Sequence, residues 1–153
     1  MEIAMNENTL RFTRIFEAPR QLVFSCMVEP EHLTHFWGPV GVTTPLDTIS
    51  VDARAGGAFT TVMVNDADGS TYPTSARYLE VNPPERLSWI EDHSGMTVTI
   101  TFTELGTRRT QVDIEQTNVP APMLDPAAQA GFLTSLDRFE AHLARWAGAG
   151  AHR

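Results

Sequence analysis

The stretch MTVTITFTE, residues 96–104, decides the fold class of this chain. Threonines alternate along it with apolar side chains, which are Met96, Val98, Ile100 and Phe102. This period of two predicts a strand with one covered face and one wet face. The next segment, residues 109–116, repeats the pattern, so the two indicate an antiparallel sheet that is solvated on one side.

An apolar stripe near the end of the chain is suited to cover the other side. Asp125-Pro126 is typical of a helix start, because the carboxylate can cap the first turn and proline fits there. Apolar residues then recur at spacings of three and four: Phe132, Leu136, Phe139, Leu143 and Trp146. We therefore expect a helix with a stripe roughly 20 Å long, lying on the apolar face of the sheet.

The remaining segments complete an α+β order. A strand at 9–16 is followed by two short helices, about 19–28 and 31–37, the second ended by Gly38-Pro39. Strands follow at 46–52, 58–65, 72–81 and 86–92. The economical arrangement is a curved antiparallel sheet wrapped around the C-terminal helix. We expect one domain at 9–147, a disordered N-terminal tail at 1–8 and a frayed tail at 148–153.

Composition excludes several classes of function. The 153 residues fit a single domain, and the net charge of −8 with scattered arginines argues against nucleic acid and against anionic membranes. The chain has no lysine, so lysine Schiff-base chemistry is excluded. No stretch reaches the roughly 20 apolar residues of a membrane span, and residues 1–8 do not read as a signal peptide, so we expect a cytoplasmic protein.

Cys26 is the only cysteine, which rules out an intramolecular disulfide and a cysteine-based metal cluster. It lies in an apolar helical stretch, where we expect a small buried hydrophobe. His32 and His35 lie three apart on the second short helix, and metal ligation is conceivable there. We favour a solvated polar face, and we expect no metal, no cofactor and no catalytic residues.

Four short elements in order resemble one family. They are EPEHLTHFWGP at 29–39, VDARAGG at 51–57, EVNPPERL at 80–87 and GTRRT at 106–110. The chain is similar over about residues 10–146 to the bacterial homologues of the heat shock protein 90 ATPase activator, in the START-like (SRPBCC) superfamily. It departs from the family pattern at Phe36 and Phe132, where tryptophan is common.

The resemblance implies a helix-grip fold with a cavity between the sheet and the long helix, often occupied by a small, largely apolar molecule. It does not imply one function, because relatives include lipid and hormone binders, cyclases and chaperone activators. The residues that we expect to line a ligand site are Trp37, Phe59, Thr61, Met63, Trp89, Glu91, Val98, Phe132 and Leu136.

Glu91 is the one candidate acid among these residues. On a covered strand face it would be a buried carboxylate with a raised pKa, and Tyr72 or Tyr78 would be its partner in an enzyme. We favour the alternative that Glu91 reaches solvent near its strand end. Asp52 and Arg54 are spaced to form an ion pair at the strand end, with a structural rather than a catalytic role, and at a surface such a pair adds only about 0–1 kcal/mol.

Three functions compete. A small-molecule binding module is favoured, ahead of a chaperone-associated or other protein-interaction domain and of a cyclase-like or hydrolase-like enzyme acting on a cavity-bound substrate. A homodimer formed along an edge strand is left open by the sequence.

Overall fold

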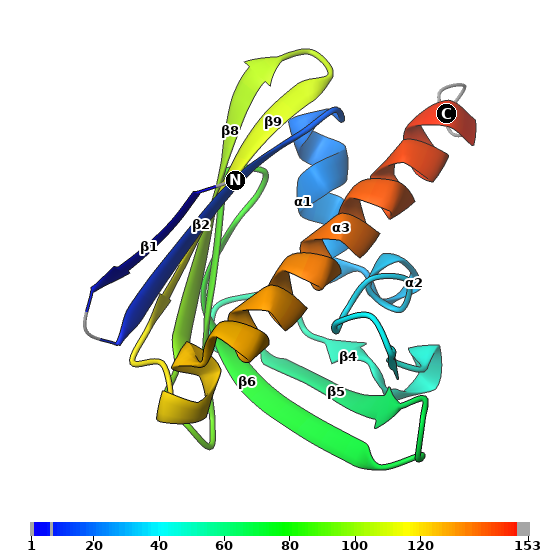
Figure 1. Ribbon diagram of the computed structural model, residues 1–153. Helices are drawn as coiled ribbons and strands as arrows, with labels where there is room; N and C mark the ends of the chain where they lie inside the picture. Colours follow the sequence, from blue (N-terminus) through cyan, green and yellow to red (C-terminus); the bar gives the residue numbers. More distant parts are fainter. Residues whose placement is uncertain (1, 7, 150–153) are drawn as a thin grey trace.

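The computed structural model describes residues 2–6 and 8–149, and the side chains of residues 8–146. A strongly curved antiparallel sheet wraps around one long helix, α3 (Pro126–Ala149), as Figure 1 shows. Two short helices, α1 (Arg20–Val28) and α2 (Pro30–Leu33), lie beside α3. This is the α+β helix-grip architecture expected from the sequence.

The described part of the sheet has nine strands in the order β1-β2-β9-β8-β7-β6-β5-β3, with β4 also paired to β5. Their bounds are Glu2–Asn6 for β1, Thr9–Phe16 for β2, Val42–Thr43 for β3, Ser50–Val51 for β4, Ala58–Asn65 for β5, Thr71–Asn82 for β6, Arg86–Glu91 for β7, Thr97–Gly106 for β8 and Arg109–Thr117 for β9. All the pairings are antiparallel.

The alternation in β8 places its apolar residues inside. Val98, Ile100 and Phe102 are buried, whereas Thr103 is exposed and the three threonines before it are half-buried. Ile100 lies opposite Ile114 of β9, so the inner faces of the two strands coincide. The prediction from the sequence is confirmed.

The stripe on α3 packs into this concave face. Leu136, Phe139 and Leu143 are buried, and the Phe139 ring lies 5.0 Å from that of Phe16 on β2 and 4.3 Å from that of Phe36. Burying one such aromatic side chain contributes about 1.5–3 kcal/mol. Asp125 caps the helix as expected, since its Oδ1 accepts a hydrogen bond of 3.1 Å from the Ala127 N–H.

The two chain ends differ from the expected tails. Residues 2–6 form β1, with Ala4 opposite Arg11 of β2. An edge strand gains backbone hydrogen bonds from its neighbour whatever its side chains are, and this gain is not visible in composition. At the other end α3 continues to Ala149, and the expected fraying of 150–153 lies outside the described residues.

Two internal boundaries also differ. The helix expected at 31–37 ends at Leu33, whose carbonyl oxygen accepts hydrogen bonds from the N–H groups of both Phe36 and Trp37. Most of the strand expected at 46–52 is replaced by a short 3-10 turn at Leu46–Thr48, followed by β4. The hydroxyl of Thr48 donates to the carbonyl of Pro45 and stabilises that turn.

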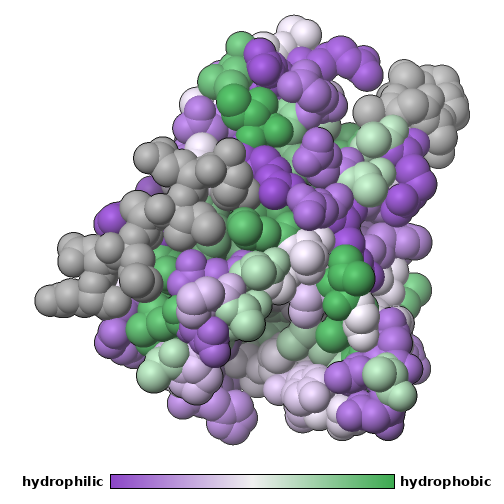
Figure 2. Space-filling view, viewed as in Figure 1, coloured by the Kyte–Doolittle hydropathy of each residue, from purple (hydrophilic) through white to green (hydrophobic). Residues whose placement is uncertain are grey.

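Seven large apolar residues are exposed among the described residues. In Figure 2, hydrophilic and hydrophobic residues are interspersed over the coloured part of the face that carries α3. The exposed large apolar residues come from several elements, two of them from β6, and are Ile15, Val40, Leu46, Tyr72, Leu79, Leu105 and Met123. Of the helices in the described part, none has the length and apolar character that crossing a membrane requires.

Candidate functional site

A small pocket opens on the inner side of the sheet, where β5, β6 and β7 lie next to the turn that follows α2. Its volume is about 80 Å³. The pocket is lined by Trp37, Phe59, Met63, Thr74, Ser75, Ala76, Trp89 and Glu91. Because pockets for drug-sized ligands measure roughly 300–1,000 Å³, this one admits a small molecule or part of a larger one.

The strand register brings these residues together. Phe59 of β5 lies opposite Ala76 of β6, and Ala76 lies opposite Glu91 of β7, so the three side chains share the inner face. Trp89 comes two residues before Glu91 and therefore points to the same side. Trp37 reaches the site from the other wall, just before Gly38, whose positive φ of 100° turns the chain away.

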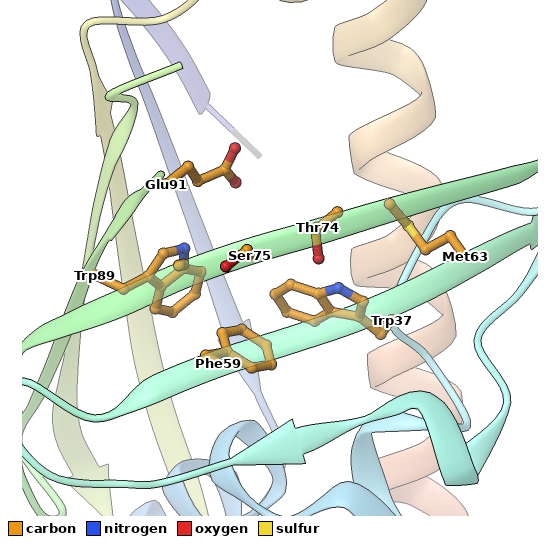
Figure 3. Close-up of a pocket in the computed structure, with 8 residues that line it drawn as sticks. Trp37, Phe59, Met63, Thr74, Ser75, Trp89 and Glu91 are labelled. Carbon is orange, nitrogen blue, oxygen red and sulfur yellow. The ribbon is translucent and has the colours of Figure 1, made fainter. Parts of the chain in front are cut away.

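Three aromatic rings form the floor of the pocket. The Phe59 ring centroid lies 5.2 Å from that of Trp37 and 5.5 Å from that of Trp89, both in edge-to-face geometry. Figure 3 shows the rings grouped together, with Met63 on the side away from Trp89 and Glu91. Aromatic faces and edges held in this way offer apolar walls to a bound molecule.

Glu91 gives the pocket its polar end. Burial raises the pKa of its carboxyl, and the hydroxyl of Ser94 donates a long hydrogen bond of 3.5 Å to Oε1. The side chain is half-buried on the inner face, so it keeps part of the solvent exposure expected for it while it lines the pocket. A carboxyl in such a place can accept a hydrogen bond from a ligand, or donate one when protonated.

Five of the nine residues expected at a ligand site line this pocket: Trp37, Phe59, Met63, Trp89 and Glu91. The other four lie elsewhere. Thr61 is buried on the same face of β5 as Phe59 and Met63, with its hydroxyl 2.6 Å from that of Thr74, but it does not line the pocket. Val98 is opposite Trp89 in the next strand.

Phe132 and Leu136 belong to the packing of α3. The Phe132 ring lies 4.7 Å from that of Phe12, and Leu136 is buried in the core. The pocket is therefore lined by strands and by Trp37, with no lining residue from α3 among those described. Sequence reasoning missed Thr74, Ser75 and Ala76. Pairing β6 with β5 as antiparallel neighbours would have placed these three residues beside the aromatic positions of β5.

The two tyrosines proposed as partners of Glu91 do not line the pocket. Tyr72 is largely exposed. Tyr78 is buried against Phe59, its hydroxyl has no hydrogen-bond partner among the described residues, and burial raises the pKa of its phenol. Glu91 is thus the one titratable side chain lining the pocket in the part of the chain that the structure describes.

The remaining sequence hypotheses have mixed outcomes. Asp52 and Arg54 form the expected exposed ion pair, with 2.9 Å between Arg54 Nε and Asp52 Oδ2. Cys26 is buried, as expected. The solvated face expected for His32 is wrong: the ring is buried because α3 brings His142 against it.

Comparison with known proteins identifies similar chains. A family model described as Activator of Hsp90 ATPase homolog 1-like protein matches residues 17–144. A crystal structure from Chromobacterium violaceum is 28% identical, with a TM-score of 0.79, and the match covers 89% of this chain and 97% of the other. One from Nitrosomonas europaea is 25% identical, with a TM-score of 0.79 and coverage of 93% and 97%.

A third structure, of the AHSA1 protein from Silicibacter pomeroyi, is 24% identical, with a TM-score of 0.73 and coverage of 89% and 97%; this likeness concerns the fold alone. No curated protein matches the chain.

Proposed function

Because the chain belongs to the Activator of Hsp90 ATPase homolog 1-like family, with the fold of the START-like superfamily, we propose that it is a binding module for a small, largely apolar molecule. The observation that carries this proposal is the pocket in which Trp37, Phe59 and Trp89 surround a space of about 80 Å³. The ligand stacks against these rings with its apolar body.

The polar end of the pocket defines the ligand further. Glu91 sits on the inner face beside Trp89, and it is the titratable group among the described lining residues. A ligand that brings a hydroxyl or an N–H group to this carboxylate satisfies a partly buried acceptor, and such charge-assisted hydrogen bonds are the stronger ones. We therefore propose a small ring compound that carries one hydrogen-bond donor.

The family description also suggests a second function, in which the chain assists a chaperone of the Hsp90 type. A docking surface for a partner protein is often a large exposed apolar patch. The exposed apolar residues here are dispersed over strands and turns, which favours the small-molecule proposal. An enzyme would need at least two converging titratable groups, and beside Glu91 no second one lines the pocket among the described residues.

Filling the pocket tests the proposal. Ala76 is buried in the pocket wall, so Ala76→Leu places three more carbon atoms in the space that the ligand would occupy. Ala58 on the neighbouring strand is exposed, and Ala58→Leu is the matched control. Binding of phenol and of toluene is measured from the fluorescence of Trp37 and Trp89, and native mass spectrometry examines freshly purified protein for a retained ligand.

We expect phenol to bind more tightly than toluene, because phenol alone donates a hydrogen bond to Glu91. Ala76→Leu weakens binding of both compounds at least about tenfold, which corresponds to about 1.4 kcal/mol, and Ala58→Leu changes it less than about twofold. Equal affinities in the two variants, with both folded by circular dichroism, would contradict the proposal. Stimulation of a chaperone ATPase that survives Ala76→Leu would favour the second function instead.

A further inference from the structure

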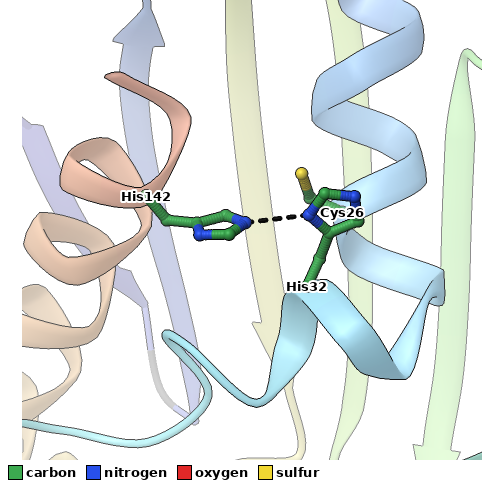
Figure 4. A group of neighbouring side chains, drawn as sticks. All are labelled: Cys26, His32 and His142. Carbon is green, nitrogen blue, oxygen red and sulfur yellow. Dashed lines mark hydrogen bonds between the residues drawn. The ribbon is translucent and has the colours of Figure 1, made fainter. Parts of the chain in front are cut away.

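A second cluster of reactive side chains lies away from the pocket, where three helices meet. Cys26 comes from α1, His32 from α2 and His142 from α3. Figure 4 shows the three side chains directed toward one point between these helices. Their ligand atoms, one sulfur and two ring nitrogens, all lie within 4.8 Å of one another.

The cluster is buried and its atoms are in close contact. Cys26 is fully buried, and the exposed fractions of His32 and His142 are 6% and 2%. His32 Nδ1 lies 2.8 Å from His142 Nε2, at hydrogen-bond distance. Buried polar groups normally find partners for their hydrogen-bonding atoms, yet Nδ1 of His142 has none among the described residues. Among the described residues, the His142 ring therefore has a hydrogen-bond partner for Nε2 but none for Nδ1.

Neighbouring side chains fix the orientation of both rings. His35 stacks on His142 with a centroid distance of 5.0 Å and an interplanar angle of 15°. The Trp146 ring lies 4.6 Å from the His32 ring. Glu29 Oε1 is 3.7 Å from His32 Nε2, and the Glu29 side chain is half-exposed. The two rings are thus held by neighbouring aromatic side chains, and a half-exposed carboxylate lies beside His32.

We propose that Cys26, His32 and His142 bind a zinc(II) ion that links α1, α2 and α3. Thiolate sulfur and imidazole nitrogen are ligand types that bind zinc, whereas calcium and magnesium require oxygen ligands. Three protein ligands leave the fourth tetrahedral position for a water molecule.

The carboxylate of Glu29 supports this assignment. Histidine ligands of metals commonly direct their second ring nitrogen at a carboxylate, which fixes the tautomer and leaves the other nitrogen free to coordinate. Glu29 faces Nε2 of His32, so Nδ1 is the nitrogen that coordinates, and this is the atom directed at His142. Zn–N bonds of about 2.0–2.1 Å in a tetrahedral site place two nitrogens about 3.3 Å apart, so the rings separate by about half an ångström when the ion enters.

The protonation states are compatible with metal binding. Burial lowers the pKa of both His32 and His142, the latter to about 4, so both imidazoles are neutral at pH 7. Burial raises the pKa of the Cys26 thiol to about 12, so the ion must displace a proton from sulfur when it binds. The proposal does not depend on the small-molecule function, because no residue of the cluster lines the pocket.

Cobalt(II) replaces zinc in such sites and reports on its ligands. The full chain without an affinity tag is freed of metals with a chelator, returned to chelator-free buffer and titrated with cobalt(II). We expect one cobalt per chain, a sulfur-to-cobalt charge-transfer band in the near ultraviolet, and loss of that band when one equivalent of zinc is added. Zinc at 100 times its dissociation constant should raise the unfolding temperature by roughly 5–10 °C.

Two variants and one control assign the ligands. Cys26→Ala removes the charge-transfer band and the thermal shift, and His142→Gln weakens cobalt binding at least about tenfold. His93 is an exposed histidine on a turn, and His93→Gln should leave both signals unchanged. If Cys26→Ala fails to fold by circular dichroism, Cys26→Ser serves in its place. Absence of a stoichiometric complex, or a band that persists without the thiol, would overturn the proposal.

Discussion

At the scale of single residues, the surroundings rather than the residue type decide what a side chain does. Glu91 and Glu85 are both glutamates in or beside β7, but Glu85 is exposed on a turn and Glu91 is half-buried beside Trp89. Burial raises the pKa of Glu91 because the charged form loses part of its hydration. That pKa shift has a consequence for stability.

Folding favours the protonated form of Glu91, since its folded-state pKa lies above its ordinary value of 4.5. The resulting contribution to stability is complete below that ordinary value and is lost as the pH rises through the raised pKa. A glutamine side chain cannot ionise, so we expect the stability of Glu91→Gln relative to the wild type to increase between pH 4 and pH 7. Urea unfolding at both pH values measures it.

Glu85→Gln is the control, and its stability relative to the wild type should be the same at both pH values within about 0.5 kcal/mol. A Glu91→Gln variant whose relative stability falls as the pH rises would mean that the carboxylate is stabilised by partners rather than penalised by burial.

At the scale of elements, α3 holds the pocket wall from behind without lining it. Arg138 on α3 directs its Nη1 at the carbonyl oxygens of Gly38, Pro39 and Val42, at 2.7, 3.0 and 3.0 Å. These carbonyls belong to the turn that begins directly after Trp37. The charge and planar fork of arginine let one side chain fix several backbone groups of the turn.

Removing the Arg138 charge should make the position of Trp37 in the pocket less well fixed. We expect Arg138→Gln to lower the free energy of unfolding by about 1–3 kcal/mol, because partly buried carbonyls lose a charged donor, and to weaken phenol binding. Chemical denaturation and fluorescence titration measure the two effects. Arg145 is exposed on the same helix, and Arg145→Gln should change neither quantity. If Arg138→Gln is destabilised but binds phenol as tightly as the wild type, then the turn after Trp37 does not determine ligand binding.

At the scale of the whole molecule, one apolar core joins both ends of the chain. Buried residues from β2, β8 and α3 form a single cluster, in which Phe16, Phe102 and Phe139 are almost completely buried. A helix that fills the concave face of a sheet cannot leave without exposing that face. The division into one domain at 9–147 therefore predicts cooperative unfolding. The homodimer remains a prediction.

We expect urea to unfold the protein in a single transition. Fluorescence reports on Trp37 and Trp89 in the pocket and on Trp146 of α3, and far-ultraviolet circular dichroism reports on all helices and strands. The two curves should have the same midpoint and slope. Separate midpoints, with helix signal lost first, would mean that α3 detaches while the sheet persists.

Much of the architecture was determined by the sequence alone, because it depends on local periodicity. The period of two in residues 96–104 and the three-and-four spacing from Phe132 to Trp146 correctly predicted a half-solvated sheet and the helix that covers it. The hairpin strand β1 was not predicted, since backbone pairing at an edge depends on a neighbour more than on the strand's own residues.

The sites depended on tertiary structure. Five pocket residues were predicted because they are aromatic, apolar or acidic residues at positions expected on a covered strand face or, for Trp37, at the mouth of a cavity. Only the tertiary structure shows that Phe132 packs against Phe12 and that Leu136 lies in the core. His32 looked like a surface residue because its contact, His142, is 110 positions away in the chain. Local patterns specify which way a side chain points on its own element, and only the packing of distant elements specifies what it meets there.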